Sequence, residues 1–523
     1  ELEVGMSNIA TFRNLLPDEI YEDMGYEARP YPERLQEFFA SDLVIGTGKE
    51  ILVGELHTIG PRTRVIRDEV TGEELPVLEE DAETVVHAEL FYPFPDERPD
   101  TLVLSPPSRF GKANVGFVAY HNTVAVNDFR YLSRGMALNL DWDDPWYSAF
   151  QNRSMRRSYF APMSGFLYVE PFEVRKEVIV RPKDIQRFVD LGLADATMIP
   201  AEQRGLILER IATFLTAKQP VTINGKTAEP ILDRASFLNR TLKSSMVVSP
   251  GIDINIDSAV VGVIFVYPTP SLAHTATMTW DMFDGRVQIV PTSAVDEAGG
   301  LPTFLEPDYA VLEWENFLKN PTVPGLVTLA PPPSSAALWL YQLRWWALAT
   351  ALLLLTLWAR NRLLPVAMAA TVSLLVLAAS LIFGQRLAPP GEATETVVKD
   401  LLRNIYQAFD YRQESDIYDT LERSVGGDLL TDIYLETQRS LELTSQGGAR
   451  AKVKSIEVQA IEIVAAEVPN AFRASTTWNV NGSVGHWGHV HTRVNQYQAE
   501  LLIQVIDSHW KLIEMNVLQE QRL

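Results

Sequence analysis

The sequence contains no cysteine in 523 residues. This absence excludes disulfide bonds, thiolate metal sites and cysteine nucleophiles. Basic residues are also in deficit, because 45 Lys and Arg face 67 Asp and Glu and leave a formal net charge of -22. Binding to nucleic acid requires positive charge against the phosphates, so we expect no nucleic-acid partner.

Common catalytic motifs are missing as well. The sequence has no Gly-x-Ser-x-Gly elbow, no phosphate loop, no His-Glu-x-x-His and no dinucleotide-binding glycine motif. It therefore favours a non-enzymatic role without settling the question. The chain begins at Glu1 with neither an initiator Met nor a basic and apolar leader. We expect that a signal peptide has been removed.

The most informative feature that is present is a pair of apolar runs, residues 336–358 and 363–384. Each is roughly as long as a helix that crosses a bilayer core of about 30 Å. The link between them is so short that the two spans must be antiparallel neighbours. Residues 336–384 are therefore predicted to form a transmembrane hairpin that contacts the lipid bilayer and keeps both flanking regions on one side.

Charge predicts which side that is. The link carries Arg360 and Arg362 and no acid, and short loops rich in Arg remain cytoplasmic. Both large regions are then periplasmic, on the inner or an intracytoplasmic membrane of a bacterium. Arg344 can snorkel toward the outer surface, where aromatic rings also gather. Those rings belong to Trp339, Tyr341, Trp345 and Trp346.

The spans contain no Asp, Glu, Lys or His, which favours an anchor over a transporter. The second span is rich in small residues, which allow other membrane helices to approach closely. A docking surface for membrane subunits is therefore compatible with the anchor. The small residues are Ala367, Ala369, Ala370, Ser373, Ala378, Ala379 and Ser380.

Short apolar runs separated by Pro, Gly and Asp predict a mainly-β, sandwich-like ectodomain before the hairpin. We expect a β-rich outer domain with N-terminal helical turns over residues 1–165. A second β-sandwich-like domain is expected over residues 166–330. It contains a helical insert at residues 183–217.

Residues 393–523 are predicted to form a separate α+β domain. An amphipathic stripe over 394–409 and two further helical segments precede four long strand patterns. This order resembles the NTF2-like cone in its Tim44-like variety. The resemblance implies a curved sheet around a cavity, in a fold that hosts enzymes, binding modules and assembly factors.

The whole chain also resembles a family of uncharacterised bacterial double-spanning envelope proteins. Three stretches carry this resemblance: Val126–Tyr131, Leu140–Trp146 and Gly485–His491. The family implies an envelope location and supplies no activity to transfer.

The sharpest candidate for a chemical site is the sequence His486-Trp-Gly-His489-Val-His491, which holds three of the eight histidines. Imidazole is a common ligand of copper and zinc, and residues two apart on a strand share a face. The alternative is a glycine-rich hairpin whose histidines bond to neighbours or meet a partner.

A second candidate is the acidic turn with Asp141, Asp143 and Asp144. Clustered carboxylates outside the cytoplasm can hold calcium. The segment lacks the glycine and distal glutamate of an EF-hand loop, and Asp-Asp-Pro is also an ordinary way to open a turn.

Two functions remain from the sequence. The first is a non-enzymatic accessory or scaffold subunit whose periplasmic domains bind envelope or membrane-complex subunits. The alternative is a periplasmic protein that binds or delivers copper or zinc through the histidine cluster. A weaker third idea is a small-ligand or hydrolase site in the NTF2-like cavity.

Overall fold

The computed structural model describes residues 1–64, 83–94, 98–110, 115–158, 161–240, 245–321, 323, 325–361, 364–384, 392–411, 414–443, 449–450, 452–468, 470–486 and 489–523. The side chains of residues 361, 436–443, 449–450, 465, 484–486 and 489–491 lie outside this description.

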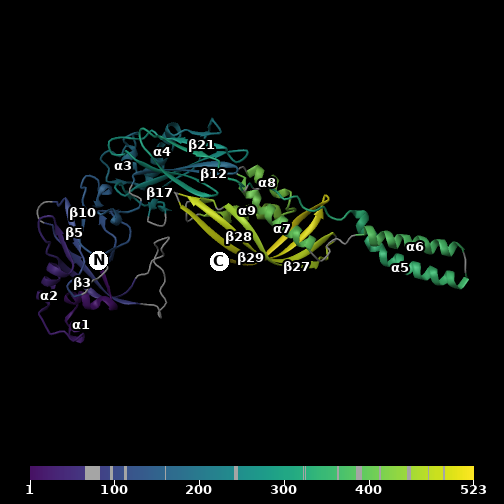
Figure 1. Cartoon of the computed structure of the whole chain (residues 1–523), viewed down its shortest axis with the longest axis horizontal. Coiled ribbons are helices and arrows are strands. Elements are labelled where there is room, and N and C mark those ends of the chain that lie inside the picture. Colours follow the sequence, from purple (N-terminus) through teal and green to yellow (C-terminus); the bar gives the residue numbers. More distant parts are fainter. Residues whose placement is uncertain are drawn as a thin grey trace.

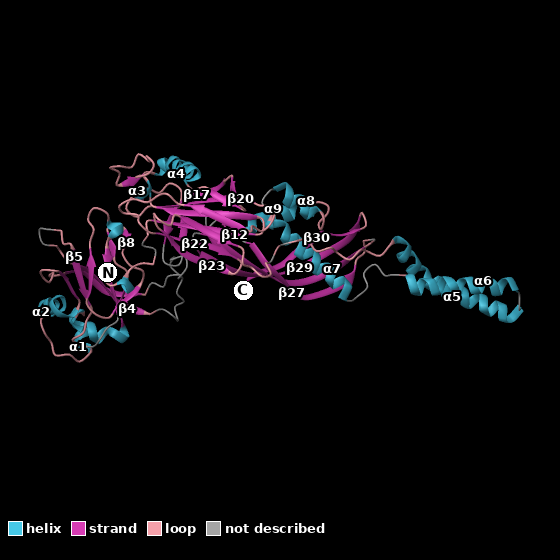
Figure 2. Cartoon of the chain, turned by 45° about the horizontal axis from the view of Figure 1, so that its top comes forward, coloured by secondary structure: helices cyan, strands magenta, loops and turns pink. Residues whose placement is uncertain are grey.

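The molecule is elongated, and its parts do not follow one another in space as they do in sequence (Figure 1). The N-terminal region lies at one end and the apolar hairpin at the other. The C-terminal domain lies between the middle domain and the hairpin, although the hairpin precedes it in the chain (Figures 1 and 2).

The N-terminal region is built from small sheets and short helices. One sheet has the order β1-β4-β3 and another has the order β11-β10-β5-β2. Leu15, Leu16 and Phe38 are fully buried in the core that the first sheet shares with the helices. The elements are β1 (Leu2–Gly5), α1 (Asp18–Asp23), α2 (Tyr31–Glu37), β2 (Val44–Thr47), β3 (Glu55–Thr63), β4 (Thr84–Phe91), β5 (Thr101–Ser105), β6 (Val115–Phe117), β7 (Tyr120–His121), β8 (Val124–Ala125), β9 (Arg130–Leu132), β10 (Met136–Asn139) and β11 (Ala149–Phe150).

The middle domain is a sandwich of a seven-stranded sheet, β18-β17-β20-β13-β12-β22-β23, and a four-stranded sheet, β16-β15-β21-β24. Only β12 and β22 run parallel among the seven strands. The elements are β12 (Met163–Glu170), β13 (Glu173–Val180), α3 (Pro182–Ile185), β14 (Met198–Ile199), α4 (Arg204–Lys218), β15 (Val221–Ile223), β16 (Lys226–Ala228), β17 (Ile231–Arg240), β18 (Ser245–Val247), β19 (Ile254–Asn255), β20 (Val260–Pro268), β21 (Thr275–Thr279), β22 (Val290–Asp296), β23 (Gly299–Leu305) and β24 (Val311–Glu315).

The two sheets of the middle domain approach closely. A Cβ atom at Gly165 would lie 2.9 Å from the Met278 side chain and 3.0 Å from the Trp280 side chain, so any larger residue would require these side chains to move. The shared core also includes α4, which belongs to the predicted helical insert. Strand β12 begins at Met163, so the division predicted at residue 165 falls inside a strand of this domain.

Strand β13 is buried along its whole length because both of its faces are covered. Val174, Val178 and Val180 point into the sandwich core. On the other face, Ile179 packs in a cluster with Val124 and Trp146 of the N-terminal region. Glu173, Arg175 and Glu177 share this second face, whereas Lys176 lies on the same face as Val174 and donates to backbone carbonyls at the end of α4.

The C-terminal domain has three helices followed by four long antiparallel strands, as predicted, and the strands lie in the order β27-β28-β29-β30. The apolar stripe of α7 packs on Phe472, Trp478 and Leu501 of the sheet. The elements are α7 (Glu392–Gln407), α8 (Glu414–Glu422), α9 (Leu429–Leu441), β25 (Glu442–Leu443), β26 (Ala449–Arg450), β27 (Lys452–Ala465), β28 (Ala471–His486), β29 (His489–Ile506) and β30 (His509–Arg522).

The apolar hairpin consists of α5 (Ser335–Asn361) and α6 (Leu364–Phe383). Both helices are long and apolar enough to cross a membrane, and most of their surface is exposed. Ala351 and Ala370 are buried where small side chains let the helices meet. The chain is therefore a membrane-associated protein with largely β-structured domains outside its hairpin.

Candidate functional site at the domain seam

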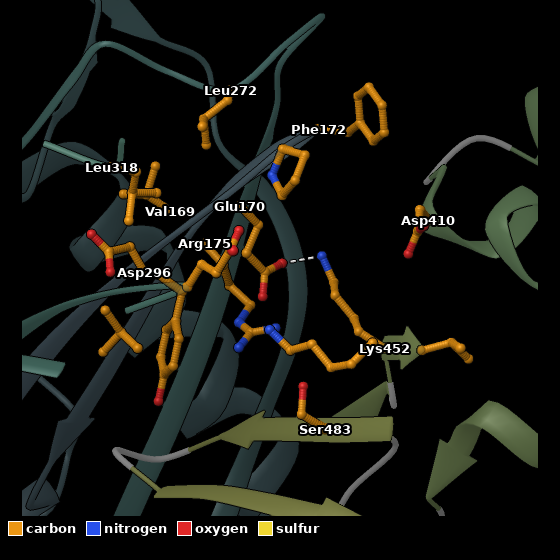
Figure 3. Close-up of a pocket in the computed structure, with 16 residues that line it drawn as sticks. Val169, Glu170, Phe172, Arg175, Leu272, Asp296, Leu318, Asp410, Lys452 and Ser483 are labelled. Carbon is orange, nitrogen blue, oxygen red and sulfur yellow. Dashed lines mark hydrogen bonds and ion pairs between the residues drawn. The ribbon is translucent and has the colours of Figure 1, made fainter. Parts of the chain in front are cut away.

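A charged contact between domains lies where the middle domain meets the C-terminal domain, which we call the seam. Lys452, the first residue of β27, donates a hydrogen bond to the Glu170 carboxylate at the end of β12 (Figure 3). The Lys452 Nζ also lies 3.3 Å from the Glu173 Oε1. One lysine of the C-terminal domain therefore forms ion pairs with two carboxylates at the β12–β13 turn.

An aromatic contact adjoins this ion pair. Phe172, in the β12–β13 turn, stacks on Tyr411, with ring centroids 5.1 Å apart and planes 23° apart. Tyr411 follows α7, so the contact joins the same two domains by a second route. Stacked rings add apolar burial to the charged contact.

A cavity of about 460 Å³ opens at the seam. Val169, Leu272 and Leu318 provide apolar walls, and Lys452, Asp410 and Ser483 supply polar groups from the C-terminal domain (Figure 3). The complete lining is Tyr168, Val169, Glu170, Pro171, Phe172, Arg175, Leu272, Val295, Asp296, Glu297, Leu318, Asp410, Lys452, Val453, Lys454 and Ser483.

Burial and the neighbouring carboxylates have opposite effects on the pKa values of the basic groups of the seam. The Arg175 Nε lies 3.0 Å from the Glu177 Oε1, and its guanidinium lies over the Tyr168 ring. Burial lowers the pKa of Arg175, but Glu177, Glu170 and Glu173 outweigh burial and raise it. For Lys452, burial likewise opposes Glu170 and Glu173, and the net effect raises its pKa. Both groups therefore remain cationic.

Among the acids of the seam, Asp410 has a pKa near neutral pH. Burial raises its pKa to about 7, and the charges of Glu170 and Glu173 act in the same direction. The positive charges of Lys452 and Lys454 oppose this shift. The seam therefore changes its net charge near neutral pH, in a cavity that can hold a small polar molecule or several waters.

Sequence reasoning missed this site because Glu170 and Lys452 are 282 positions apart and no motif links them. One local signal was present. Glu173, Arg175 and Glu177 alternate with valine, lysine and valine in a strand whose surroundings are apolar. Charges at every second position of a strand indicate a polar face, which is ordinarily exposed, so the pattern shows the face but not that another domain covers it.

The acidic turn of Asp141, Asp143 and Asp144 contains a buried ion pair and an Asx turn. Arg181 donates to both carboxylate oxygens of Asp144, at 3.0 and 3.2 Å, and to Asp184 at 2.6 Å. All three residues are buried. The Asp141 Oδ1 accepts the backbone N–H groups of Asp143 and Asp144, as in an ordinary Asx turn.

The guanidinium of Arg181 therefore occupies the position that a cation would take beside Asp144. Across the described ranges, no three His, Asp or Glu side chains form a group suited to a metal ion. The geometry places Asp141 in a turn with the backbone of Asp143 and Asp144, and it pairs the Asp144 carboxylate with Arg181.

The histidine cluster lies at the β28–β29 hairpin. The backbone register pairs His486 with His489 and Val484 with His491. The side chains of these three histidines lie outside the described residues. Ser483, in the same ladder, lines the seam cavity, so this end of the sheet is the one next to the middle domain.

Comparisons with known proteins supply no family. No family model and no curated protein matches the chain. One solved structure with a detected similarity is a de novo designed β-sheet protein determined by NMR. It is 15% identical over 24% of this chain and 88% of its own length, with a TM-score of 0.14. A similarity this low carries no argument about fold or function.

Proposed function

We propose that this chain is a non-enzymatic, membrane-anchored scaffold or accessory subunit whose outer domains bind other envelope or membrane-complex subunits. The observation that carries the proposal is the seam, because it joins the middle and C-terminal domains across a long sequence separation. The middle and C-terminal domains, which flank the hairpin in the sequence, then form one continuous unit instead of two independent domains.

The connection to the membrane supports the same proposal. The segment between β24 and α5 is held against the C-terminal domain. The Val327 N–H donates to the Asn404 Oδ1 at 2.7 Å, and the Asn404 Nδ2 donates to the Val327 carbonyl at 3.0 Å. Leu329 packs against the C-terminal core. The segment that leads into the hairpin is therefore bound to the C-terminal domain up to Leu329, close to the first residue of α5.

Strand β23 offers a surface that suits a protein partner. It is the last strand in the order of the seven-stranded sheet, and Leu301 and Phe304 on it are 56% and 62% exposed. An exposed apolar edge strand pairs readily with a strand of another chain. We propose that this edge receives an extended segment of a partner subunit.

The C-terminal domain is proposed to be NTF2-like, in the Tim44-like variety. Support comes from the order of three helices and four long strands, and from the bulges in β27 and β30 that bend such strands. The outer domains are proposed to be periplasmic on a bacterial inner or intracytoplasmic membrane, because Arg360 and Arg362 mark the short link as cytoplasmic.

Co-purification tests the scaffold proposal. The tagged full chain is extracted from its native membrane in a mild detergent, and accompanying proteins are quantified by mass spectrometry. We expect a partner in near-stoichiometric amount that Phe304→Glu reduces at least tenfold. Phe317→Glu is the matched control, because Phe317 is 78% exposed and lies outside β23. An unaccompanied chain would contradict the proposal, and equal loss in both variants would contradict the role of β23.

The second candidate function is binding or delivery of copper or zinc by His486, His489 and His491. The observation that favours it is the hairpin register, which sets His486 opposite His489. Replacing all three residues by Ala should abolish stoichiometric metal, measured by elemental analysis of the purified chain, and leave partner binding intact. Metal content equal to that of the wild type would exclude this function.

A further inference from the structure

Arg344 lies close to the level at which the hairpin leaves the hydrocarbon core. Helix α6 has 20 residues, which at about 1.5 Å per residue matches a core of about 30 Å. Its end is beside Tyr341, because a Cβ atom at Gly384 would lie 3.0 Å from the Tyr341 N and Cα atoms. Arg344 is three residues farther along α5, or roughly 4.5 Å inside that level.

The Arg344 side chain points back toward the boundary. Its guanidinium carbon lies 3.8 Å from the centroid of the Tyr341 ring and 5.2 Å from that of Trp345. Tyr341 lies one turn earlier in α5, so the side chain extends toward the N-terminal end of the helix. This is the direction in which an arginine in a span reaches the headgroups.

The charge of Arg344 has no counter-ion within the hairpin. The sequence from Ser335 to Gly384 contains no Asp or Glu. The buried Nε of Arg344 has no hydrogen-bond partner among the described residues. A cation at this depth is costly unless an anion meets it.

We propose that Arg344, Tyr341 and Trp345 form a binding site for the phosphate of a phospholipid in the leaflet next to the outer domains. Guanidinium N–H groups pair with two phosphate oxygens, and the rings hold the guanidinium in place. Trp345 is 63% exposed and Trp346 is 73% exposed, so this side of α5 is open to lipid. The proposal rests on the hairpin crossing the membrane and is independent of partner binding.

The experiment compares lipid retention by full-length variants. The wild type, Arg344→Gln and Arg344→Lys are purified in detergent, stripped of loose lipid and titrated with dioleoyl phosphatidylglycerol under native mass spectrometry. Arg360→Gln is the matched control, since it removes a hairpin arginine at the opposite end. Diacylglycerol and inorganic phosphate serve as probes that each lack one half of the lipid.

We expect one phosphatidylglycerol per wild-type chain, at least tenfold weaker binding in Arg344→Gln, an intermediate loss in Arg344→Lys and none in Arg360→Gln. Diacylglycerol should not replace the phospholipid, and inorganic phosphate should compete only weakly. Equal lipid binding by the wild type and Arg344→Gln would overturn the proposal. Equally tight binding of free phosphate would overturn the lipid as the source, and loss of a protein partner with lipid retention unchanged would assign Arg344 to that partner.

Discussion

Lys452 on β27 donates to Glu170 on β12, although the two residues are separated by 282 positions and by the whole apolar hairpin. The chain leaves the middle domain, forms the hairpin and returns to close this contact. Both ends of the hairpin are therefore connected to one block of structure. This contact between the two domains that flank the hairpin in the sequence supports the scaffold proposal.

The seam should show measurable coupling between its charges. Lys452→Met should destabilise the contact by about 1–2 kcal/mol, because it leaves two carboxylates near each other with partial access to water. Faster hydrogen exchange in the β12–β13 turn would report the change. Adding Glu170→Gln should recover part of the loss in a double-mutant cycle. Lys399→Met, at an exposed lysine of the same domain, is the control. Additive effects would contradict a direct pair.

Asp410 should make the seam weaker at alkaline pH. Its pKa is about 7 in the folded protein, against an ordinary 3.8. Between about pH 4 and 7 the folded state retains a proton that the unfolded chain has released, so stability falls as pH rises through this window. Asp410→Asn should flatten that fall and add about 1 kcal/mol at pH 8. Denaturant unfolding at pH 5 and pH 8 measures both values, and an unchanged slope would contradict the assignment.

Lys176 should produce the opposite pH dependence in the middle domain. It is fully buried, and it donates to the Gln219 carbonyl at 2.8 Å and the Leu215 carbonyl at 3.3 Å at the end of α4. Burial lowers its pKa to about 7, so between pH 7 and 10 the unfolded chain binds more protons and stability rises.

Lys176→Met should remove this rise and cost about 1–3 kcal/mol at pH 9, because the carbonyls lose their donor. Thermal unfolding across that pH range checks the result. Lys218→Met, which changes a half-exposed lysine at the end of α4, should leave the pH profile as it is.

Asp144 should matter for folding and not for calcium. Asp144→Asn removes half of a buried ion pair with Arg181 and should cost about 3 kcal/mol. Asp143→Asn, at the exposed neighbour, should cost little. Thermal melts with calcium or with chelator should coincide for the wild type. A calcium-dependent rise in melting temperature that Asp144→Asn abolishes would contradict this account.

The absence of cysteine allows a direct test of membrane topology. Cysteines placed at the exposed positions Glu19 and Gln519 should react with a membrane-impermeant maleimide added to spheroplasts. A cysteine at Ala359, beside the short link, should react only after the membrane is permeabilised. The unmodified chain has no thiol and gives the background. Labelling of position 359 from outside would reverse the proposed orientation.

Local patterns were enough to predict much of the fold. The hairpin follows from two uninterrupted apolar runs, and the stripe from Val397 to Ile405 indicates a helix that packs on a sheet. The sequence predicts a change of domain at residue 165, which lies within β12, because strands flank this position and periodicity does not show which core a strand joins.

The candidate site could not be predicted in the same way. Glu170, Arg175 and Lys452 meet only through tertiary structure, so no spacing in the sequence indicates the cavity. The acidic turn illustrates the converse. The carboxylate of Asp144 is of a type that often binds metals, and the sequence does not reveal that Arg181 lies against it. In both the seam and the acidic turn, the decisive contact is an ion pair between residues that are far apart in the sequence.

The mass of the particle that the chain forms in its own membrane tests the scaffold proposal most directly. The protein is extracted with surrounding lipid in polymer nanodiscs and examined by native mass spectrometry, with Phe304→Glu measured in parallel. The account predicts a defined particle heavier than the 58.6 kDa chain by the mass of a different protein, and loss of that mass in the variant. A wild-type particle that contains only this chain and lipid would contradict it.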